Sequence, residues 1–246
     1  MKRIALITGA SRGLGATLAR AFATRDFGLV LNARTSDGLA RLARELSDGG
    51  ADVRARPGDI ADPSTRAALI EAARNLGGLD LLINNASELG GIAPLERFDD
   101  RTAERVLRVN LVAPLALIAA ALPLLAERRG LVVNLSSDAA GGAYPGWGVY
   151  GASKAALDLA TRTLAGELSA RQVGVISVDP GDMRTAMHQE AFPGEDISDR
   201  PQPEVTLPFW HWLLAQDPMT VTGQRFVAQG YVDAARGPVS VEQVHA

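Results

Sequence analysis

Two residues that could do chemistry together, Tyr150 and Lys154, stand four positions apart. Lysine occurs elsewhere only at position 2, and arginine supplies the remaining basic residues. If residues 149–169 form a helix, both side chains lie on the same face, one turn apart. An ammonium about 4 Å from a phenol favours the phenolate by roughly 4 kcal/mol at an effective dielectric near 20. We therefore expect the pKa of Tyr150 to fall from about 10 by up to about three units, although such a pair also occurs as an ordinary feature of helix surfaces.

A serine hydroxyl adds to this pair. Ser137 ends the run LVVNLSS at 131–137, whose apolar residues predict a buried strand. Open α/β sheets bind their ligands at the carboxyl ends of the strands. We therefore expect Ser137 to lie at the same edge of a sheet as Tyr150 and Lys154.

Three glycines at 9, 13 and 15 separate a short apolar strand from an amphipathic helix. Glycine permits a tight turn there and lets backbone N–H groups approach a pyrophosphate at the positive end of the helix. Turns of this kind also occur in proteins that bind no ligand.

Four sequence landmarks, in this order, resemble the short-chain dehydrogenases/reductases: TGASRGLG at 8–15, NNAS at 84–87, the set Ser137/Tyr150/Lys154, and PGDMRT at 180–185. The resemblance covers about residues 2–228. It implies an α/β fold: a single doubly wound Rossmann-type domain over 1–246, with a parallel sheet of about seven strands and helices on both faces.

The alternation of apolar runs with helical patterns also favours repeated βα units. The expected strands are 4–7, 29–32, 53–55, 79–83, 131–135, 173–178 and 224–227. The expected helices are 13–24, one through Leu39, Leu42 and Leu46, one that begins at Pro63, 99–110, 111–128 and 149–169. Residues 186–208, rich in proline and acids, break this alternation, and we expect them to form a flexible substrate lid.

Bulk composition sets limits on the class of protein. Hydrophobic residues make up 47% of the 246, and charged residues 22%, as in a folded globule with a large core. The net charge of −3 does not favour binding to nucleic acid or to anionic lipid, and there is no cysteine. The apolar residues 111–126 are too few for a membrane span and contain two prolines, so we expect a buried helix and a cytoplasmic protein.

The resemblance implies which residues hold a dinucleotide. Asp59 would receive the adenine amino group, Asn85 and Ala86 would border the adenine ribose, and Asn84 would brace the sheet. Pro180, Gly181, Met183 and Thr185 would flank the nicotinamide. The complete expected set is Gly9, Ser11, Arg12, Gly13, Leu14, Gly15, Arg34, Asp59, Ile60, Asn85, Ala86, Tyr150, Lys154, Pro180, Gly181, Met183 and Thr185. Ser87 departs from the family pattern, which usually has glycine there.

The choice between NAD and NADP depends on the end of the second strand, where NAD enzymes usually place a carboxylate. This chain has Asn32-Ala33-Arg34 instead, and Arg12 adds a second guanidinium. Two arginines would bind a 2′-phosphate through charge-assisted contacts, so we expect NADP(H). The alternative is that both arginines are ordinary solvated residues.

By the same resemblance, Asn110, Ser137, Tyr150 and Lys154 form the catalytic tetrad. Ser137 would hold a substrate carbonyl, Tyr150 would be the general acid or base, Lys154 would lower the tyrosine pKa, and Asn110 would hold a water. Tyr144 lacks a cation four residues on. No metal is expected, because His188, His211 and His245 have no ligand spacing.

The substrate is expected to be a small carbonyl or alcohol compound. The candidate pocket wall, which could equally be core or a subunit interface, comprises Trp147, Met187, Phe192, Phe209, Trp210 and Trp212. Arg128, Arg129 and Arg171 leave open a 3-oxoacyl-[acyl-carrier-protein] reductase, although arginines also suit a helix end. A non-catalytic NADP sensor or scaffold is a further alternative.

The family is often tetrameric, so a homo-oligomer, tetramer or dimer, is expected. The carboxyl end departs from the family pattern, with Ala228-Gln229-Gly230-Tyr231 where an aspartate and paired glycines are common.

Overall fold

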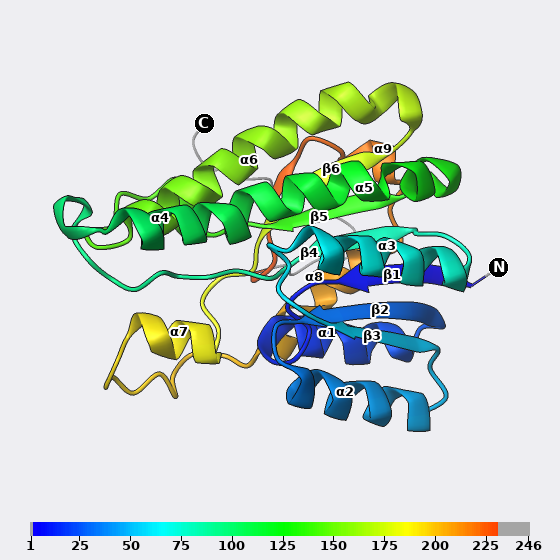
Figure 1. The fold of residues 1–246 in the computed structure, drawn as a ribbon, viewed down its shortest axis with the longest axis horizontal. Helices are drawn as coiled ribbons and strands as arrows, with labels where there is room; N and C mark the ends of the chain where they lie inside the picture. Colours follow the sequence, from blue (N-terminus) through cyan, green and yellow to red (C-terminus); the bar gives the residue numbers. More distant parts are fainter. Residues whose placement is uncertain (1, 231–246) are drawn as a thin grey trace.

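Seven parallel strands form one sheet in the computed structural model, which describes residues 2–230 (Figure 1). The order across the sheet is β3-β2-β1-β4-β5-β6-β7, and every neighbouring pair is parallel. The strands are β1 (Arg3–Ile7), β2 (Phe27–Ala33), β3 (Val53–Pro57), β4 (Leu81–Asn84), β5 (Leu131–Leu135), β6 (Gly174–Asp179) and β7 (Arg225–Val227). This confirms the doubly wound Rossmann-type α/β fold. The strand order reverses between β1 and β4, where such sheets open a crevice for a ligand.

Helices cover both faces of this sheet (Figure 1). Alternate strand residues point to opposite faces, so that Ala5 and Ile7 belong to one apolar core and Ile4 and Leu6 to the other. The first core is closed by α1 (Gly13–Ala23), α2 (Ser36–Asp48) and α8 (Leu207–Leu213), and the second by α3 (Pro63–Leu76), α5 (Ala113–Arg128) and α6 (Gly148–Leu168). Other short elements are η1 (Leu95–Arg97), η3 (Asp138–Ala140), η4 (Ser169–Arg171) and α9 (Pro218–Val221).

The two helices expected at 99–110 and 111–128 are one continuous helix, Asp100–Arg128. It consists of α4 (Asp100–Leu107), a π-helical turn η2 (Arg108–Val112) and α5. Length and composition alone would allow this helix to cross a membrane, but half of its most apolar window is buried. Leu117, Ile118 and Leu125 pack into the second core, as expected for a core helix.

Residues 186–208 contain more regular structure than the sequence suggested. They hold α7 (Ala186–Ala191), the 3-10 turn η5 (Pro203–Thr206) and the start of α8. Thr185 stabilises the first turn of α7, because its Oγ1 accepts a hydrogen bond from the His188 N–H at 3.2 Å. In Figure 1, α7 stands apart from the sheet, on the side away from the amino terminus. Its role as a substrate lid stays a prediction.

Helix α8 corrects part of the expected pocket wall. Phe209 and Trp210 are 0% exposed and Trp212 packs against the same core, so these three side chains hold α8 on the sheet. Tyr231 and His245, which also entered the sequence predictions, lie outside the described residues.

Candidate active site

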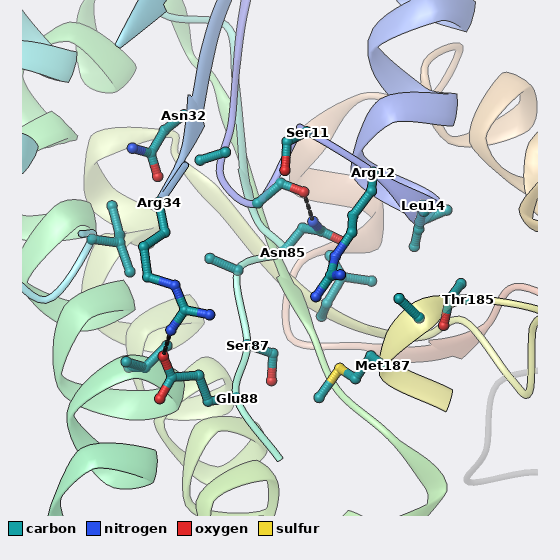
Figure 2. Close-up of a pocket in the computed structure, with 18 of the residues that line it drawn as sticks. Ser11, Arg12, Leu14, Asn32, Arg34, Asn85, Ser87, Glu88, Thr185 and Met187 are labelled. Atoms are coloured by element: carbon teal, nitrogen blue, oxygen red, sulfur yellow. Dashed lines mark hydrogen bonds and ion pairs between the residues drawn. The ribbon is translucent and has the colours of Figure 1, made fainter. Parts of the chain in front are cut away.

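A cavity of about 440 Å³ lies at the carboxyl edge of the sheet (Figure 2). Its walls come from the carboxyl ends of β2 and β5, from the segments that follow β1 to β6, and from the helices α4, η2, α6 and α7. A second cavity of about 130 Å³ adjoins it. The wall that both cavities share comprises Ser136, Tyr150, Pro180, Met183, Thr185 and Met187. The two cavities therefore meet at the predicted catalytic tyrosine.

The glycine turn forms one end of the larger cavity. A Cβ on Gly15 would lie 2.5 Å from the Gly9 oxygen, and one on Gly9 would lie 2.9 Å from Ala86 Cα, so neither position has room for a side chain. Helix α1 begins beside this turn without a side-chain cap and without an acidic residue in its first turn. Its positive end is thus available to an anionic group in the cavity, as a pyrophosphate requires.

Asn85 and Thr8 fix the shape of this turn. The Asn85 side-chain amide donates to the backbone oxygen of Thr8 at 2.8 Å and to that of Gly9 at 3.1 Å. The Thr8 side-chain Oγ1 accepts from the backbone N–H groups of Asn85 and Ala86, both at 3.0 Å. The side chain of Asn85 therefore supports the turn, while Asn85 and Ala86 line the cavity. Asn84 donates to Asn134 at 2.8 Å across β4 and β5, which is the bracing that the resemblance implied.

Arg12 and Arg34 extend into the cavity from opposite sides (Figure 2). Each already meets a carboxylate that the sequence did not indicate: Arg12 Nη2 lies 3.4 Å from Glu190 Oε1 of α7, and Arg34 Nη1 contacts Glu88. Both arginine side chains are 64% exposed. The Arg12–Glu190 pair is exposed on both sides and contributes little to stability, so a ligand phosphate can replace Glu190 at small cost.

Asp59 and Ile60 lie at the same end of the cavity. Asp59 Oδ2 is 2.7 Å from Arg105 Nη1, and Asp59 Oδ1 accepts from the Ala61 N–H at 2.9 Å. Burial raises the pKa of Asp59, but the hydrogen bonds from Arg105 and Ala61 outweigh it and hold this pKa below the ordinary value. Asp59 is therefore a fixed carboxylate, suited to accept from an amino group.

Most of the predicted cofactor residues line the larger cavity. The exceptions are Gly15, which packs beneath the turn, and Gly181, which lines the second cavity. The residues confirmed as lining are Gly9, Ser11, Arg12, Gly13, Leu14, Arg34, Asp59, Ile60, Asn85, Ala86, Tyr150, Lys154, Pro180, Met183 and Thr185. In addition, Ser136 Oγ is buried with no hydrogen-bond partner among the described residues. A cavity with these groups fits a dinucleotide.

Tyr150 and Lys154 lie in the first two turns of α6 and are 8% and 2% exposed. The Lys154 ammonium donates to the Leu135 oxygen at 2.7 Å and lies 5.6 Å from the centre of the Tyr150 ring. The sequence-based expectation of a lowered tyrosine pKa is wrong. Burial raises the pKa of Tyr150 to about 12, although the Ser137 hydroxyl acts against this rise. Burial likewise lowers the pKa of Lys154 to about 8, although Asp158 and Asp179 favour its charged form.

Ser137 lies two residues beyond β5, as the sequence indicated. Its Oγ donates to Asp138 Oδ1 at 3.0 Å and accepts from the Ala139 N–H at 3.2 Å. Its hydroxyl also acts to lower the pKa of the Tyr150 phenol. The two hydroxyl groups that the sequence singled out are therefore neighbours.

Arg225 of β7, which the sequence did not indicate, fixes the surroundings of Ser137. Its guanidinium donates to the Ser137 backbone oxygen at 2.8 Å, to Asp158 Oδ2 at 3.0 Å and to Asp179 Oδ2 at 3.2 Å. Both carboxylates are less than a tenth exposed. One guanidinium thus connects α6, the end of β6 and Ser137, which lies two residues beyond β5.

Asn110 lies in the π-helical turn and is 1% exposed. Its Oδ1 accepts from Ser87 Oγ at 3.1 Å and from the Glu88 backbone N–H at 2.8 Å. Its amide nitrogen donates to the Glu88 backbone oxygen at 2.8 Å and to Ser153 Oγ at 3.0 Å. These four bonds use the full capacity of the side chain. The Asn110 side chain therefore positions its neighbours, and the expected water would need another atom.

Ser87 and Gln229, which both depart from the family pattern, make side-chain hydrogen bonds at the site. The Ser87 hydroxyl donates to Asn110 Oδ1 and acts to lower the pKa of the Tyr150 phenol. The Gln229 side-chain amide donates to the backbone oxygens of Pro180 and Asp182 at 3.1 and 2.6 Å. It thereby holds the segment that is expected beside the nicotinamide.

Three of the six expected pocket-wall residues surround Tyr150. Trp147 lies 5.8 Å from the Tyr150 ring and 6.2 Å from the Phe192 ring, and Met187 packs in the same small cluster. His188, expected to be structural or on the surface, lines the second cavity and lies 4.8 Å from Phe192. The reacting end is thus mostly apolar, with Asp138 and Asp182 among its walls.

Arg128, Arg129 and Arg171 lie at the ends of α5 and η4, just before β5 and β6 begin. Arg128 donates to the Gly77 oxygen, which precedes β4. All three arginines therefore lie at the amino edge of the sheet, whereas the cavities lie at its carboxyl edge. The acyl-carrier alternative stays a prediction.

Tyr144 cannot share the role of Tyr150. Its phenol is exposed and donates to Asp138 Oδ2 at 2.8 Å, and this hydrogen bond raises its pKa.

Comparisons with known proteins identify the family of this chain. A model of the family described as short chain dehydrogenase matches residues 3–196. The chain is 39% identical over 220 residues to an L-xylo-3-hexulose reductase from Hypocrea jecorina, covering 78% of this chain and 70% of that protein. It is 32% identical over 235 residues to the uncharacterized oxidoreductase YciK from Escherichia coli, covering 92% of each.

Solved structures show the same fold. A short chain dehydrogenase from Shigella flexneri, complexed with NADP, superposes with a TM-score of 0.86 at 31% identity, covering 92% of this chain and 96% of that one. The match of the family model over most of the chain, together with these relatives, establishes that this protein belongs to the short-chain dehydrogenase/reductase family of oxidoreductases.

Proposed function

We propose that this protein is an NADP(H)-dependent oxidoreductase that reduces a carbonyl compound to an alcohol, with Tyr150 as the general acid. The observation that carries this proposal is the buried Tyr150 phenol, which lies where the two cavities meet, with the Ser137 hydroxyl acting to lower its pKa. Because burial raises its pKa to about 12, the phenol is protonated at neutral pH, which is the form that can donate a proton.

The preference for NADP(H) rests on Arg12 and Arg34. Both side chains reach the larger cavity, and no acidic residue ends β2. Guanidinium groups bind a 2′-phosphate in charge-assisted, often bidentate contacts. The related Shigella protein was solved with NADP, which supports the same choice here.

The chain's own residues account for proton transfer and orientation. A bound nicotinamide supplies the hydride. Ser137 Oγ would donate to the substrate oxygen and hold it beside the phenol. Tyr150 would then pass its proton to that oxygen, and Lys154, oriented by the Leu135 oxygen, would stabilise the phenolate. Trp147, Met187 and Phe192 would exclude water from the carbonyl.

The test is Tyr150→Phe, assayed as NADPH consumption with a panel of ketones and aldehydes. We expect turnover to fall by about 10²–10⁴-fold, because the proton donor is lost, while NADPH still binds. Tyr144→Phe is the matched control, since Tyr144 is exposed and bonded to Asp138, and should keep turnover within about 3-fold. A Tyr150→Phe variant that reduces carbonyl compounds at full speed would contradict the proposal.

The same assay separates the alternatives. NADPH binding without turnover of any carbonyl compound would favour the sensor or scaffold. For an acyl-carrier reductase, Arg128→Ala with Arg171→Ala should slow turnover of carrier-bound substrate much more than that of a small ketone. Equal loss on both substrates would remove that alternative.

We also propose that the protein is a homo-oligomer. Leu107, Val112 and Leu159 are 37–59% exposed on the helices α4, η2 and α6, so a second copy packed there would remove apolar area from water. Analytical ultracentrifugation at micromolar concentration tests this, and a monomer would contradict it.

A further inference from the structure

Four charged residues form a connected group at the end of the larger cavity where the second strand ends. This acid–arginine cluster consists of Arg34 after β2, Asp59 after β3, Glu88 after β4 and Arg105 on α4. Two positive and two negative charges thus come from four separate segments. Arg34 and Glu88 point toward each other in Figure 2.

Arg105 is the centre of this cluster. Its Nε donates to Glu88 Oε2 at 2.9 Å and its Nη2 donates to Glu88 Oε1 at 2.7 Å, which is a bidentate pair. Its Nη1 lies 2.7 Å from Asp59 Oδ2. A single guanidinium therefore compensates both carboxylates.

Arg34 has a looser connection to the same carboxylate. It contacts Glu88 through Nη1, and its side chain is 64% exposed, against 33% for Arg105 and 21% for Glu88. If Arg34 turns away, Glu88 keeps both hydrogen bonds from Arg105. Arg34 is therefore the member of the cluster that can change partner at least cost.

We propose that Arg105 sets the preference for a 2′-phosphorylated dinucleotide by holding the Glu88 carboxylate, so that Arg34 can bind the 2′-phosphate. This inference rests on the proposed NADP(H) dependence. Without Arg105, Glu88 and Asp59 place two negative charges beside one arginine, and a phosphate would add further negative charge. An uncharged ribose hydroxyl would not meet this repulsion, and Glu88 could accept a hydrogen bond from it.

The experiment measures dissociation constants of NADPH and NADH for the wild type, Arg105→Met, Glu88→Gln and the double variant. We expect Arg105→Met to weaken NADPH binding by about 10-fold or more and NADH binding by less than about 3-fold. Only NADPH carries the 2′-phosphate that Glu88 and Asp59 would repel once Arg105 no longer compensates them. Glu88→Gln alone should raise the preference for NADPH. The double variant should recover most of the lost preference, since the repelling carboxylate is gone. Arg101→Met, an exposed arginine of the same helix, is the matched control and should leave both constants unchanged.

The outcomes are distinguishable. Equal weakening of NADPH and NADH in Arg105→Met would overturn the inference and leave Arg105 as a structural residue. A double variant as poor as Arg105→Met would also overturn it. If Arg105→Met does not fold, Glu88→Gln decides alone, and an unchanged or lowered NADPH preference would overturn the inference. A wild type that binds NADH but not NADPH overturns both this inference and the proposed cofactor, whereas normal NADPH binding with no selective change in the variants overturns only the inference.

Discussion

The two ends of the active-site cavity hold their charges in opposite ways. At the glycine-turn end, Arg12 and Arg34 are 64% exposed, and each meets a carboxylate from a distant segment. At the tyrosine end, Lys154 is 2% exposed, and Asp158 and Asp179 are nearly as buried around Arg225. The same fold therefore combines exchangeable ion pairs with a fixed polar cluster.

This difference matches what each end has to do. An exposed pair is screened by water and salt, so one anion can replace another at little cost. That suits a site where a ligand phosphate displaces Glu88 or Glu190. A buried pair is costly to break and keeps one geometry, which suits proton transfer between Tyr150 and a substrate. Variants at each end should consequently differ in stability, pH dependence and ligand binding.

Arg225→Met should have the largest effect on stability. It leaves the carboxylates of Asp158 and Asp179 buried without their shared cation, and breaking a buried pair costs about 3–5 kcal/mol. The free energy of unfolding in urea measures this. Arg20→Met is the matched control at an exposed pair with Glu45, and should cost less than about 1 kcal/mol. Similar losses in both variants would contradict the comparison.

Lys154→Met tests the buried ammonium through pH. Because the folded-state pKa of Lys154 is about 8, below its ordinary value of 10.5, the unfolded chain binds more protons than the folded protein between these values. The contribution of Lys154 to the free energy of unfolding therefore rises with pH across this window. The Met variant lacks this contribution. The free energy of unfolding of the wild type minus that of the Met variant should therefore increase by up to about 3 kcal/mol from pH 7 to pH 10.5.

Urea unfolding of both proteins at several pH values measures that difference. Other titrating groups are common to the two proteins and cancel. A stability difference that does not change with pH would mean that the ammonium is not desolvated in the folded protein.

The sequence predicted the layout of the site well, because its signals are local. Strand length, helix period and the glycine turn lie within short windows, so the strands were located to within a few residues and Ser137 was placed at the end of β5. The π-helical turn around Asn110 was not predicted, since no side-chain pattern distinguishes it from the α-helix on either side.

The partners of the charged residues could not be predicted, because they are far apart in the chain. Arg12 and Glu190 are separated by 178 residues, and Arg225 and Ser137 by 88. The direction of the Tyr150 pKa shift was wrong for a related reason. Helical spacing shows that Lys154 is near, but burial and the contact between Lys154 and the Leu135 oxygen depend on the assembled fold. The aromatic residues of α8 were ambiguous because core and pocket walls share the same composition.

Arg12→Met should have a small effect on stability and a selective effect on binding. Its exposed pair with Glu190 contributes less than about 1 kcal/mol to the free energy of unfolding. If Arg12 binds the 2′-phosphate, NADPH binding should weaken by about 10-fold, whereas NADH binding should change little. Titration calorimetry with both dinucleotides measures this. Equal weakening of the two would place Arg12 at the pyrophosphate instead.

Ser87→Gly should have the smallest effect of these variants. The Ser87 hydroxyl bonds to Asn110 and lowers the pKa of Tyr150, so its loss should raise that pKa and make the phenol a weaker acid. We expect carbonyl reduction to slow by about 2–5-fold and the pH profile of alcohol oxidation to move to higher pH. Ser87→Ala removes the same hydroxyl without adding the backbone freedom of glycine, and should behave alike. If only the glycine variant is slow, the backbone at this position matters and the hydroxyl does not.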